Sequence, residues 1–182
     1  MATNDDLTPL SPQDAAGLLR ATLEAVKAEV GALSQAQLRW RPAPDAWCVN
    51  EVLGHLIEAE RRGFAGRIRL ILAQSGPLFE TWDQPAVAQA RGDCARDGYE
   101  LLREFEQVRQ DSLDLVAQLT HDQLDRSGRH PTVGMLRVRD LLHEWIFHDR
   151  AHVKQILDNV GALMWPHMGN SRRFSQPELP EL

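Results

Sequence analysis

Long hydrophobic runs, an excess of basic charge and a cysteine framework are all missing from this sequence of 182 residues. Its apolar runs are only a few residues long, whereas a membrane-spanning helix needs roughly 20. With 20 basic and 26 acidic residues the formal net charge is −6, and a sequence-independent nucleic-acid binder needs a basic surface instead. The acidic amino-terminal segment MATNDDLTPL lacks the charged and then apolar pattern of a signal peptide. We therefore expect a soluble cytoplasmic protein that binds neither nucleic acid nor a membrane.

The two cysteines, Cys48 and Cys94, form no disulfide framework and fit a reducing compartment. Apolar residues make up 43% of the chain and charged residues 25%, which excludes a globally disordered chain. A chain of this length can bury a sizeable core without disulfides or structural metals. We expect one domain over residues 1–182, with an irregular tail after Pro166.

Periodic apolar residues predict four long helices, and no stretch is typical of a strand. The predicted helices have apolar side chains at i, i+3 and i+4 spacing, and they span residues 11–33, 49–74, 93–119 and 138–160. The connections between them, including residues 77–92, are expected to be irregular. Helices without strands must bury their apolar stripes against one another. The sequence therefore predicts an all-α four-helix bundle, and its long connections leave the order of the helices open.

Two of the seven histidines, His148 and His152, stand four residues apart on the last predicted helix, so they share one helix face. That face also carries Leu141, Trp145 and Ile156, which marks it as the buried stripe. An unpaired buried polar group costs about 1–3 kcal/mol, so both imidazoles need partners. The pair alone fits core histidines bonded to carboxylates or carbonyls, and it equally fits metal ligands.

A third histidine, His55, borders the apolar stripe of the helix predicted over residues 49–74. The next residues on its lane are small, which leaves space beside the imidazole: Ala59, Gly63 and Gly66. Three inward-facing histidines on two helices favour a divalent metal held by neutral imidazole nitrogens. Zinc or nickel is the expected ion, with iron or manganese as alternatives. Because the ligands must be deprotonated, affinity should fall as the pH drops through about 6.5.

Two acidic side chains on the last helix are candidates for orienting the ligand imidazoles. Glu144 stands one turn before His148, and Asp149 stands three residues before His152. Ligand histidines nearly always need such partners, although a solvated helix face explains both acids equally well. His143 aligns with another face and is not expected to bind the metal. The histidines expected in loops or at helix ends carry no signal: His121, His130 and His167.

Two other metal motifs fit less well. The segment from His148 to His152 resembles the His-Glu-x-x-His helix of zinc proteases. Asp149 stands in place of the glutamate base, and no strand is expected that could hold a peptide. A carboxylate di-iron bundle needs Glu-x-x-His on two helices. The sequence offers only Asp140-x-x-His143 and Asp149-x-x-His152.

Cys48 stands near the start of the second helix, where free backbone amides and the helix dipole lower a thiol pKa. A reactive thiol and a passive small residue are both consistent with this position.

Two motifs and a tail segment together resemble the DinB/YfiT-like superfamily. The motifs are Arg41-Pro42-x4-Trp47-Cys48-x2-Glu51-x3-His55-Leu56 and Glu144-x3-His148-Asp149-x2-His152-x2-Gln155-Ile156, and the tail segment is Trp165-Pro166-His167-Met168-Gly169. The resemblance covers about residues 35–170. It implies a four-helix bundle that binds a divalent metal through His55, His148 and His152 near one end of the core. Relatives commonly have serine at the position of Cys48, as part of a Ser-x-x-Glu capping box with Glu51.

The resemblance also implies a choice between two functions, because the superfamily includes damage-inducible proteins, thiol S-transferases and mycothiol-dependent maleylpyruvate isomerases. The first expectation is a metal-dependent enzyme of the thiol S-transferase or hydrolase type, acting in a stress or damage response. Its partner would be a small-molecule substrate such as a low-molecular-weight thiol. Arginine-rich stretches such as Arg61-Arg62 and Arg67-x-Arg69 could receive an acidic thiol, although a solvated helix face also explains them. The alternative is a non-catalytic metal-binding stress-response dimer. The sequence identifies no catalytic residue.

Many relatives form homodimers, which implies the same assembly here. Four tryptophans in or next to the expected connections add aromatic surface that bare helices do not need: Trp40, Trp47, Trp82 and Trp165.

Overall fold

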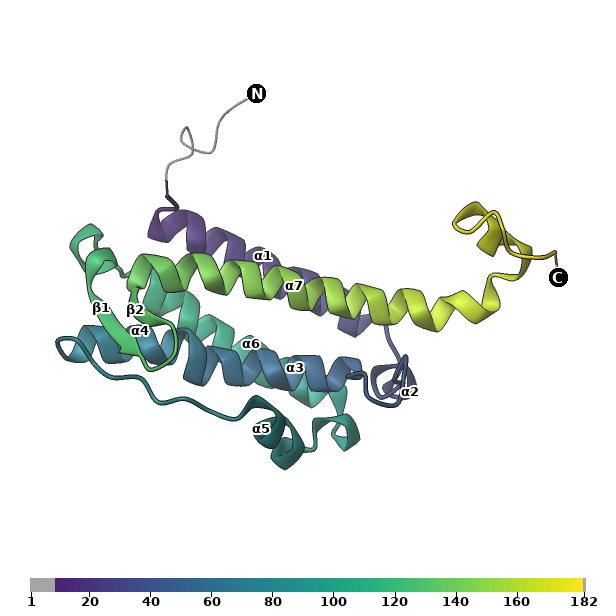
Figure 1. Cartoon of the computed structure of the whole chain (residues 1–182), viewed down its shortest axis with the longest axis horizontal. Helices are drawn as coiled ribbons and strands as arrows, with labels where there is room; N and C mark the ends of the chain where they lie inside the picture. Colours follow the sequence, from purple (N-terminus) through teal and green to yellow (C-terminus); the bar gives the residue numbers. More distant parts are fainter. Residues whose placement is uncertain (1–8, 182) are drawn as a thin grey trace, which may run out of the picture.

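The computed structural model describes residues 9–181, and its architecture is a bundle of long helices (Figure 1). The bundle consists of α1 (Pro12–Gly31), α3 (Val49–Glu58) with its continuation α4 (Ala65–Ala73), α6 (Gly98–Ala117) and α7 (Val138–Met164). The all-α four-helix prediction is confirmed. The prediction for the amino-terminal segment falls mainly on residues 1–8, which lie outside the described part of the chain.

The order of the helices in space is not a simple up-and-down meander. Helix α1 packs against α6 and α7, and α3 packs against the same two helices. This places α1 and α3 at opposite corners of the bundle, although they are consecutive long helices in the chain. The short helix α2 (Gln35–Leu38) and a proline-containing linker make the diagonal connection.

The second predicted helix is interrupted rather than continuous. A π-helical segment, Ala59–Gly63, separates α3 from α4. The Phe64 amide donates to the Ala59 carbonyl at 2.9 Å, which is the wide turn of a π-helix. A side chain at Gly66 would lie 2.0 Å from the Arg61 carbonyl oxygen, so the kink needs glycine there. The interruption turns Glu60 inward, where its side chain is buried.

The prediction that residues 77–92 are irregular is wrong for half of the segment, because α5 (Gln84–Arg91) lies there. Asp83 caps the helix by accepting from the Ala86 amide at 3.1 Å, and Gly92 ends it with φ of +59°. None of the α5 residues is buried, so the helix has no apolar stripe for a periodicity search to find. The third predicted helix likewise begins later, at Gly98 after Asp97, whose carboxylate accepts from two amides.

The expectation of no strand is corrected by a small hairpin. Strands β1 (Ser127–His130) and β2 (Gly134–Arg137) pair antiparallel. The segment after α4 joins β1, since the Phe79 amide donates to the Arg129 carbonyl at 2.9 Å. Each strand has four residues and little apolar alternation, which is too short for a period-two pattern.

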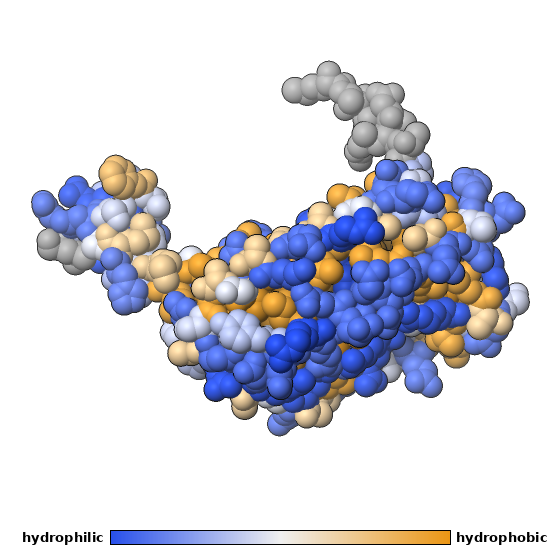
Figure 2. All heavy atoms as spheres, turned by 180° about the vertical axis from the view of Figure 1, so that it is seen from behind, coloured by the Kyte–Doolittle hydropathy of each residue, from blue (hydrophilic) through white to orange (hydrophobic). Residues whose placement is uncertain are grey.

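Helix α7 continues past Gly161, where the sequence predicted its end, and reaches Met164. Short 3-10 helices follow at Trp165–His167 and Gly169–Phe174. In Figure 1 the end of α7 extends beyond the other helices. Figure 2 shows the opposite face, where hydrophilic side chains cover most of the bundle and apolar ones appear between them. Within the described residues, no helix is long and apolar enough to cross a membrane.

Candidate metal centre

The three histidines singled out in the sequence meet between α3 and α7. One ring nitrogen from each of His55, His148 and His152 lies within 4.8 Å of the other two. The Nε2 atoms of His55 and His148 are 2.9 Å apart. The ring of His152 lies 4.5 Å from that of His55 and 4.4 Å from that of His148, measured between centroids. The structure therefore assembles one cluster of three imidazoles from residues nearly 100 positions apart.

Aromatic rings enclose this cluster. The ring of Trp47 lies 5.2 Å from that of His55, and the ring of Trp82 stacks on His55 at 6.2 Å. Phe64 contacts His148 edge-on at 5.2 Å. His55 is only 8% exposed. Aromatic walls exclude water from the nitrogens, which lowers the local dielectric and disfavours a charged imidazole.

Burial accordingly lowers the pKa of all three imidazoles. Burial, with the neighbouring His152 as a smaller cause, lowers the pKa of His55 to about 4. The same desolvation, together with the two other histidines, lowers the pKa of His148 to about 3. For His152 burial lowers the pKa, while its contact with Gln155 opposes the shift. At neutral pH the cluster is a set of neutral nitrogen donors, which is the form that binds metal ions.

The hydrogen bonds of the cluster fix the tautomer of His152, and the Nε2 atoms of His55 and His148 lie at hydrogen-bond distance from each other. Nδ1 of His152 donates to Oε1 of Gln155 at 2.9 Å, because an amide oxygen only accepts. This fixes the tautomer in which the Nε2 lone pair of His152 is available. Nδ1 of His148 is buried and has no hydrogen-bond partner among the described residues. Three neutral imidazoles whose ring nitrogens lie within 4.8 Å of one another fit a bound divalent cation.

Neither of the two acids expected to orient the ligand imidazoles hydrogen-bonds to one of them. Asp149 is fully buried, but both of its oxygens accept from Arg109, at 2.7 and 3.2 Å. Glu144 is exposed and lines a cavity rather than hydrogen-bonding a histidine. The partner that the structure supplies is Gln155, three residues after His152 on the same helix. That spacing is present in the sequence, but we considered only acidic side chains as partners of the ligand histidines.

A second buried polar cluster, centred on Arg109 of α6, escaped the sequence analysis. Its guanidinium lies between Glu60 of the π segment, at 2.6 Å, and Asp149 of α7. Ser112 makes a short hydrogen bond to Glu60, and the indole of Trp145 donates to Glu60 at 3.2 Å. Burial raises the pKa of Glu60 to about 7, opposed by Arg109 and reinforced by Asp149. A charged residue on an otherwise apolar stripe, four residues after Phe105, was the available signal.

A cavity of about 700 Å³ opens beside the histidine cluster. Ala59 and Gly63 line it next to His55, so the predicted space beside that imidazole is present. Trp82 and Gln84 contribute from the connection that the sequence left irregular. His130, which carried no signal in the sequence, lies on β1 and also lines the cavity. Segments from four parts of the chain form this space, and no local pattern could have joined them.

Arg67 of α4 also lines the cavity, and no acidic side chain within residues 9–181 pairs with it. Its Nε is buried without a hydrogen-bond partner. The guanidinium stacks over the ring of Phe79 at 5.4 Å. An unpaired cation in the wall that also contains His55 and His148 makes the cavity suited to an anion.

His143 lies away from the cluster, as the sequence predicted. It is exposed, its Nδ1 donates to the Arg139 carbonyl at 2.7 Å, and its Nε2 accepts from the Leu10 amide at 3.3 Å. Both ring nitrogens are therefore engaged in ordinary backbone contacts.

The sequence matches one known family over most of its length. A family model described as the DinB superfamily matches residues 18–156, which covers α3, α6 and most of α7. The chain belongs to the DinB superfamily. Among curated sequences, the uncharacterized protein YuaE of Bacillus subtilis (strain 168) is 25% identical over 141 residues. That alignment covers 70% of this chain and 86% of YuaE.

Two solved structures share the fold of this DinB-superfamily chain. YfiT from Bacillus subtilis, described as a probable metal-dependent hydrolase with an unusual four-helix bundle topology, superposes with a TM-score of 0.78 and 18% identity. The match covers 90% of this chain and 93% of YfiT. A mycothiol-dependent maleylpyruvate isomerase superposes with a TM-score of 0.65 and 11% identity, over 86% of this chain. This chain spans 63% of that longer protein.

Proposed function

We propose that this protein is a metal-dependent enzyme of the thiol S-transferase or hydrolase type. The observation that carries the proposal is the cluster of three neutral imidazoles, two of which, His55 and His148, line the 700 Å³ cavity. Ligand clefts of small-molecule enzymes have this size and are similarly lined by apolar and aromatic side chains. A hydrolase description for YfiT and a thiol-dependent isomerase on the same fold support the two reaction types.

His55, His148 and His152 would hold the metal ion, and zinc or nickel fits this donor set best. When bound, a divalent cation supplies Lewis acidity that stabilises the deprotonated form of a water or a thiol near neutral pH. Gln155 keeps the His152 ring in the ligating tautomer through the 2.9 Å hydrogen bond. Trp47, Trp82 and Phe64 exclude bulk water from the nitrogens, while Glu144 places a carboxylate in the cavity that can accept a proton from the substrate.

The substrate class follows from Arg67. Its unpaired guanidinium lies in the cavity wall, where it can bind a carboxylate. An anionic low-molecular-weight thiol, or a small anionic electrophile, matches both the cation and the thiol-dependent relative. A stress or damage response and a cytoplasmic location belong to this proposal as the setting in which such thiols act.

The test is an assay of metal-loaded protein with a panel of low-molecular-weight thiols and small anionic electrophiles and esters. Metal-dependent turnover by the wild type, lost in His148→Ala, is the expected result. Arg67→Met should raise KM for anionic substrates, whereas Arg69→Met is the matched control because that arginine is exposed on the same helix. Tight metal binding without any turnover across the panel would reject the enzyme and favour the second candidate.

The second candidate is a non-catalytic metal-binding dimer. Phe147 of α7 is 72% exposed, and Leu157 on the same helix is 46% exposed, so α7 offers apolar surface to a second copy. Two of the tryptophans that motivated the homodimer, Trp47 and Trp82, flank His55 instead and serve the histidine cluster. We propose a homodimer in either case, and light scattering at micromolar concentration tests it. A monomer there would contradict the dimer and leave the enzyme proposal standing.

A further inference from the structure

The two cysteines are brought together by the fold, away from the histidine cluster. Cys48 stands at the start of α3, and Cys94 lies in a 3-10 turn, Asp93–Ala95, that follows α5. Their sulfur atoms are 2.7 Å apart, although the two residues are 46 positions apart in sequence. Both are free thiols, Cys48 being fully buried and Cys94 partly exposed.

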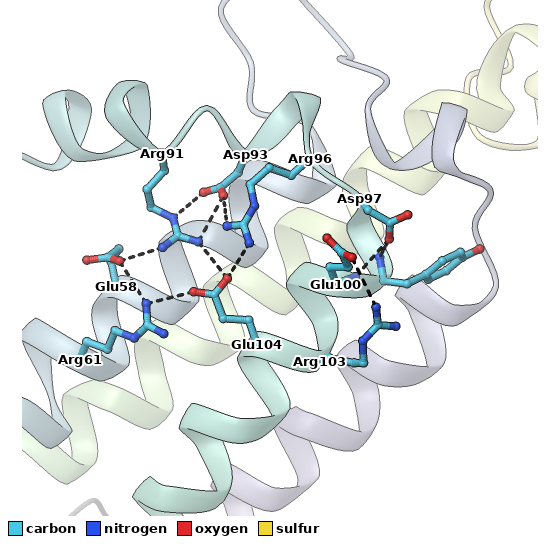
Figure 3. Close-up of polar contacts among 10 residues, drawn as sticks. Glu58, Arg61, Arg91, Asp93, Arg96, Asp97, Glu100, Arg103 and Glu104 are labelled. Carbon is cyan, nitrogen blue, oxygen red and sulfur yellow. Dashed lines mark hydrogen bonds and ion pairs between the residues drawn. The ribbon is translucent and has the colours of Figure 1, made fainter.

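Several contacts hold the turn with Cys94 against α3. Asp93, 2% exposed, accepts from Arg91 at 2.6 Å and from Arg96 at 2.9 Å. The Arg96 carbonyl accepts from Asn50 of α3 at 3.0 Å. Figure 3 shows the same two arginines bridging to Glu58 of α3 and Glu104 of α6. The position of Cys94 is therefore fixed by ion pairs and a hydrogen bond to α3 before any covalent bond forms.

The close approach of the turn also depends on a glycine. A Cβ atom at Gly54 would lie 1.8 Å from a carboxylate oxygen of Asp93 and 3.1 Å from Nε of Arg91. Only a residue without a side chain lets the turn lie directly on α3 at this point. The distance between Cys48 and Cys94 thus depends on Gly54, one turn and a half further along the same helix.

We propose that Cys48 and Cys94 are an oxidisable pair that forms an intramolecular disulfide when a low-molecular-weight disulfide is the oxidant. The sulfurs need to move by only about 0.7 Å to reach the bond length of about 2.05 Å. The loop that the bond closes contains His55, Arg67 and Trp82. Oxidation would therefore enclose part of the chain that lines the cavity in one covalent loop.

The exchange runs in two steps. Cys94, the partly exposed thiol, attacks one sulfur of the small disulfide as a thiolate and displaces one small thiol. The Cys48 sulfur then attacks Cys94 in this mixed disulfide and displaces the second small thiol. The two cysteines lose two electrons and two protons, and the small disulfide takes up both. Burial raises the pKa of the Cys48 thiol, which assigns the first attack to Cys94.

A thiolate metal site is the competing explanation, because Cys48, Glu51 and Cys94 also lie within 4.8 Å of one another. Glu51 is already engaged, with one oxygen on Arg41 at 2.6 Å and the other on the Cys48 amide at 3.0 Å. Two thiolates on one tetrahedral zinc lie about 3.8 Å apart, since each Zn–S bond is about 2.3 Å. The 2.7 Å separation is too short for that arrangement and favours the disulfide.

The experiment treats the full chain with oxidised glutathione and counts free thiols after denaturation. The wild type should lose both thiols, lose the mass of two hydrogens, and stay monomeric on a non-reducing denaturing gel. Closing a loop of this length should raise the melting temperature by roughly 4–16 °C, reversed by dithiothreitol. Cys48→Ser should instead retain a glutathione adduct on Cys94, whereas Cys94→Ser should stay reduced.

Two glycine variants test the geometry. Gly54→Ala should no longer lose its free thiols rapidly. Gly17→Ala, whose added side chain meets nothing within 4 Å, should still lose them at the wild-type rate. Circular dichroism establishes that both variants are folded. A wild type that keeps two free thiols, keeps the adduct, or forms intermolecular disulfides overturns the proposal. So does stoichiometric zinc that protects both thiols in the His148→Ala protein, since that result identifies the thiolate metal site.

Discussion

The histidine cluster and the Arg109 cluster are both buried and polar, and they meet at adjacent residues of α7, His148 and Asp149. Every nitrogen of Arg109 donates, to Glu60, to Asp149 or to the Leu19 carbonyl at 2.9 Å. In the histidine cluster the rings mainly contact one another, and Nδ1 of His148 has no partner in the described chain. A satisfied network stabilises a core, whereas an unsatisfied one beside a cavity is a place for a ligand.

The difference in charge leads to the same conclusion. The Arg109 cluster carries its compensating charges within itself, so removal of one member leaves a buried charge without a partner. The histidine cluster is neutral because burial lowers the pKa of its rings. Neutral nitrogen donors cost the fold little free energy when no ion is bound, and they stabilise it most when a cation binds.

The largest expected effect is that of Arg109→Met. This substitution keeps most of the side-chain volume but leaves two buried carboxylates without a cation, which should cost about 3–5 kcal/mol of unfolding free energy. For a chain of this length the melting temperature should fall by roughly 6–20 °C. Calorimetry of the metal-free protein measures it.

Two variants sharpen that comparison. Arg103→Met is the control, because Arg103 is 66% exposed and lies 3.9 Å from Glu100, so the change should stay within about 0.5 kcal/mol. His148→Ala in metal-free protein should cost less than Arg109→Met. Equal losses for His148→Ala and Arg109→Met would contradict the distinction between the two clusters.

Metal binding should produce the next largest effect. At free zinc or nickel near 100 times the dissociation constant, binding to the folded state alone adds about 2.7 kcal/mol, or roughly 5–11 °C in melting temperature. His55→Ala, His148→Ala and His152→Ala should each abolish this shift. His143→Ala should keep it, because its nitrogens bond to backbone groups. A full shift in His55→Ala combined with its loss in His143→Ala would exclude the three named ligands.

A smaller effect is expected for the residue that orients His152. Gln155→Leu removes the acceptor from Nδ1 and should weaken metal affinity by about 10-fold, or 1.4 kcal/mol. Glu144→Gln should leave metal affinity unchanged, since that side chain lines the cavity and does not hydrogen-bond to a ligand ring. Isothermal titration with zinc separates the two. Weakening by Glu144→Gln alone would restore the role that the sequence gave to the acid.

The smallest effect is a pH dependence of the metal-free fold. Unfolded histidine binds a proton near its ordinary pKa of 6.5, whereas folded His55 does so only near pH 4. Unfolding therefore takes up protons in this window, so stability is fullest above pH 6.5 and falls as the pH drops toward 4. Between pH 7 and pH 5.5 the loss should be about 1 kcal/mol per such histidine. Denaturant titrations of wild type and His55→Ala measure it, and an identical slope in both would refute the assignment.

The same pKa values lower the pH range in which metal affinity is expected to fall. The sequence placed the loss of affinity near pH 6.5, the value for a solvated imidazole. Because burial keeps His55 and His148 neutral to lower pH, binding should persist below that value. The lower pH range follows from tertiary burial, which an isolated helix does not have, and metal titrations at several pH values distinguish the two expectations.

Helical period alone determined which histidines could act together on one element. His148, His152 and Trp145 share a face because an α-helix repeats every 3.6 residues, and that geometry is local. The apolar stripes likewise predicted the four long helices, since amphipathic segments must bury one face. Helix α5 and the hairpin were missed because neither buries a long row of apolar side chains. The cap residues Asp83 and Gly92 were the signals in the sequence that could have indicated α5.

The tertiary structure decided the partners of those histidines. Asp149 and Gln155 each lie three residues from His152, so spacing alone fits either as its partner. In the folded chain Asp149 accepts from Arg109, 40 residues away, and Gln155 accepts from His152. The cavity and the pairing of Cys48 with Cys94 depend in the same way on segments that the chain brings together only when it folds. Hydrogen bonds and ion pairs fall off within a few ångströms, so a sequence can specify which side chains are available, and only the packed helices specify which of them touch.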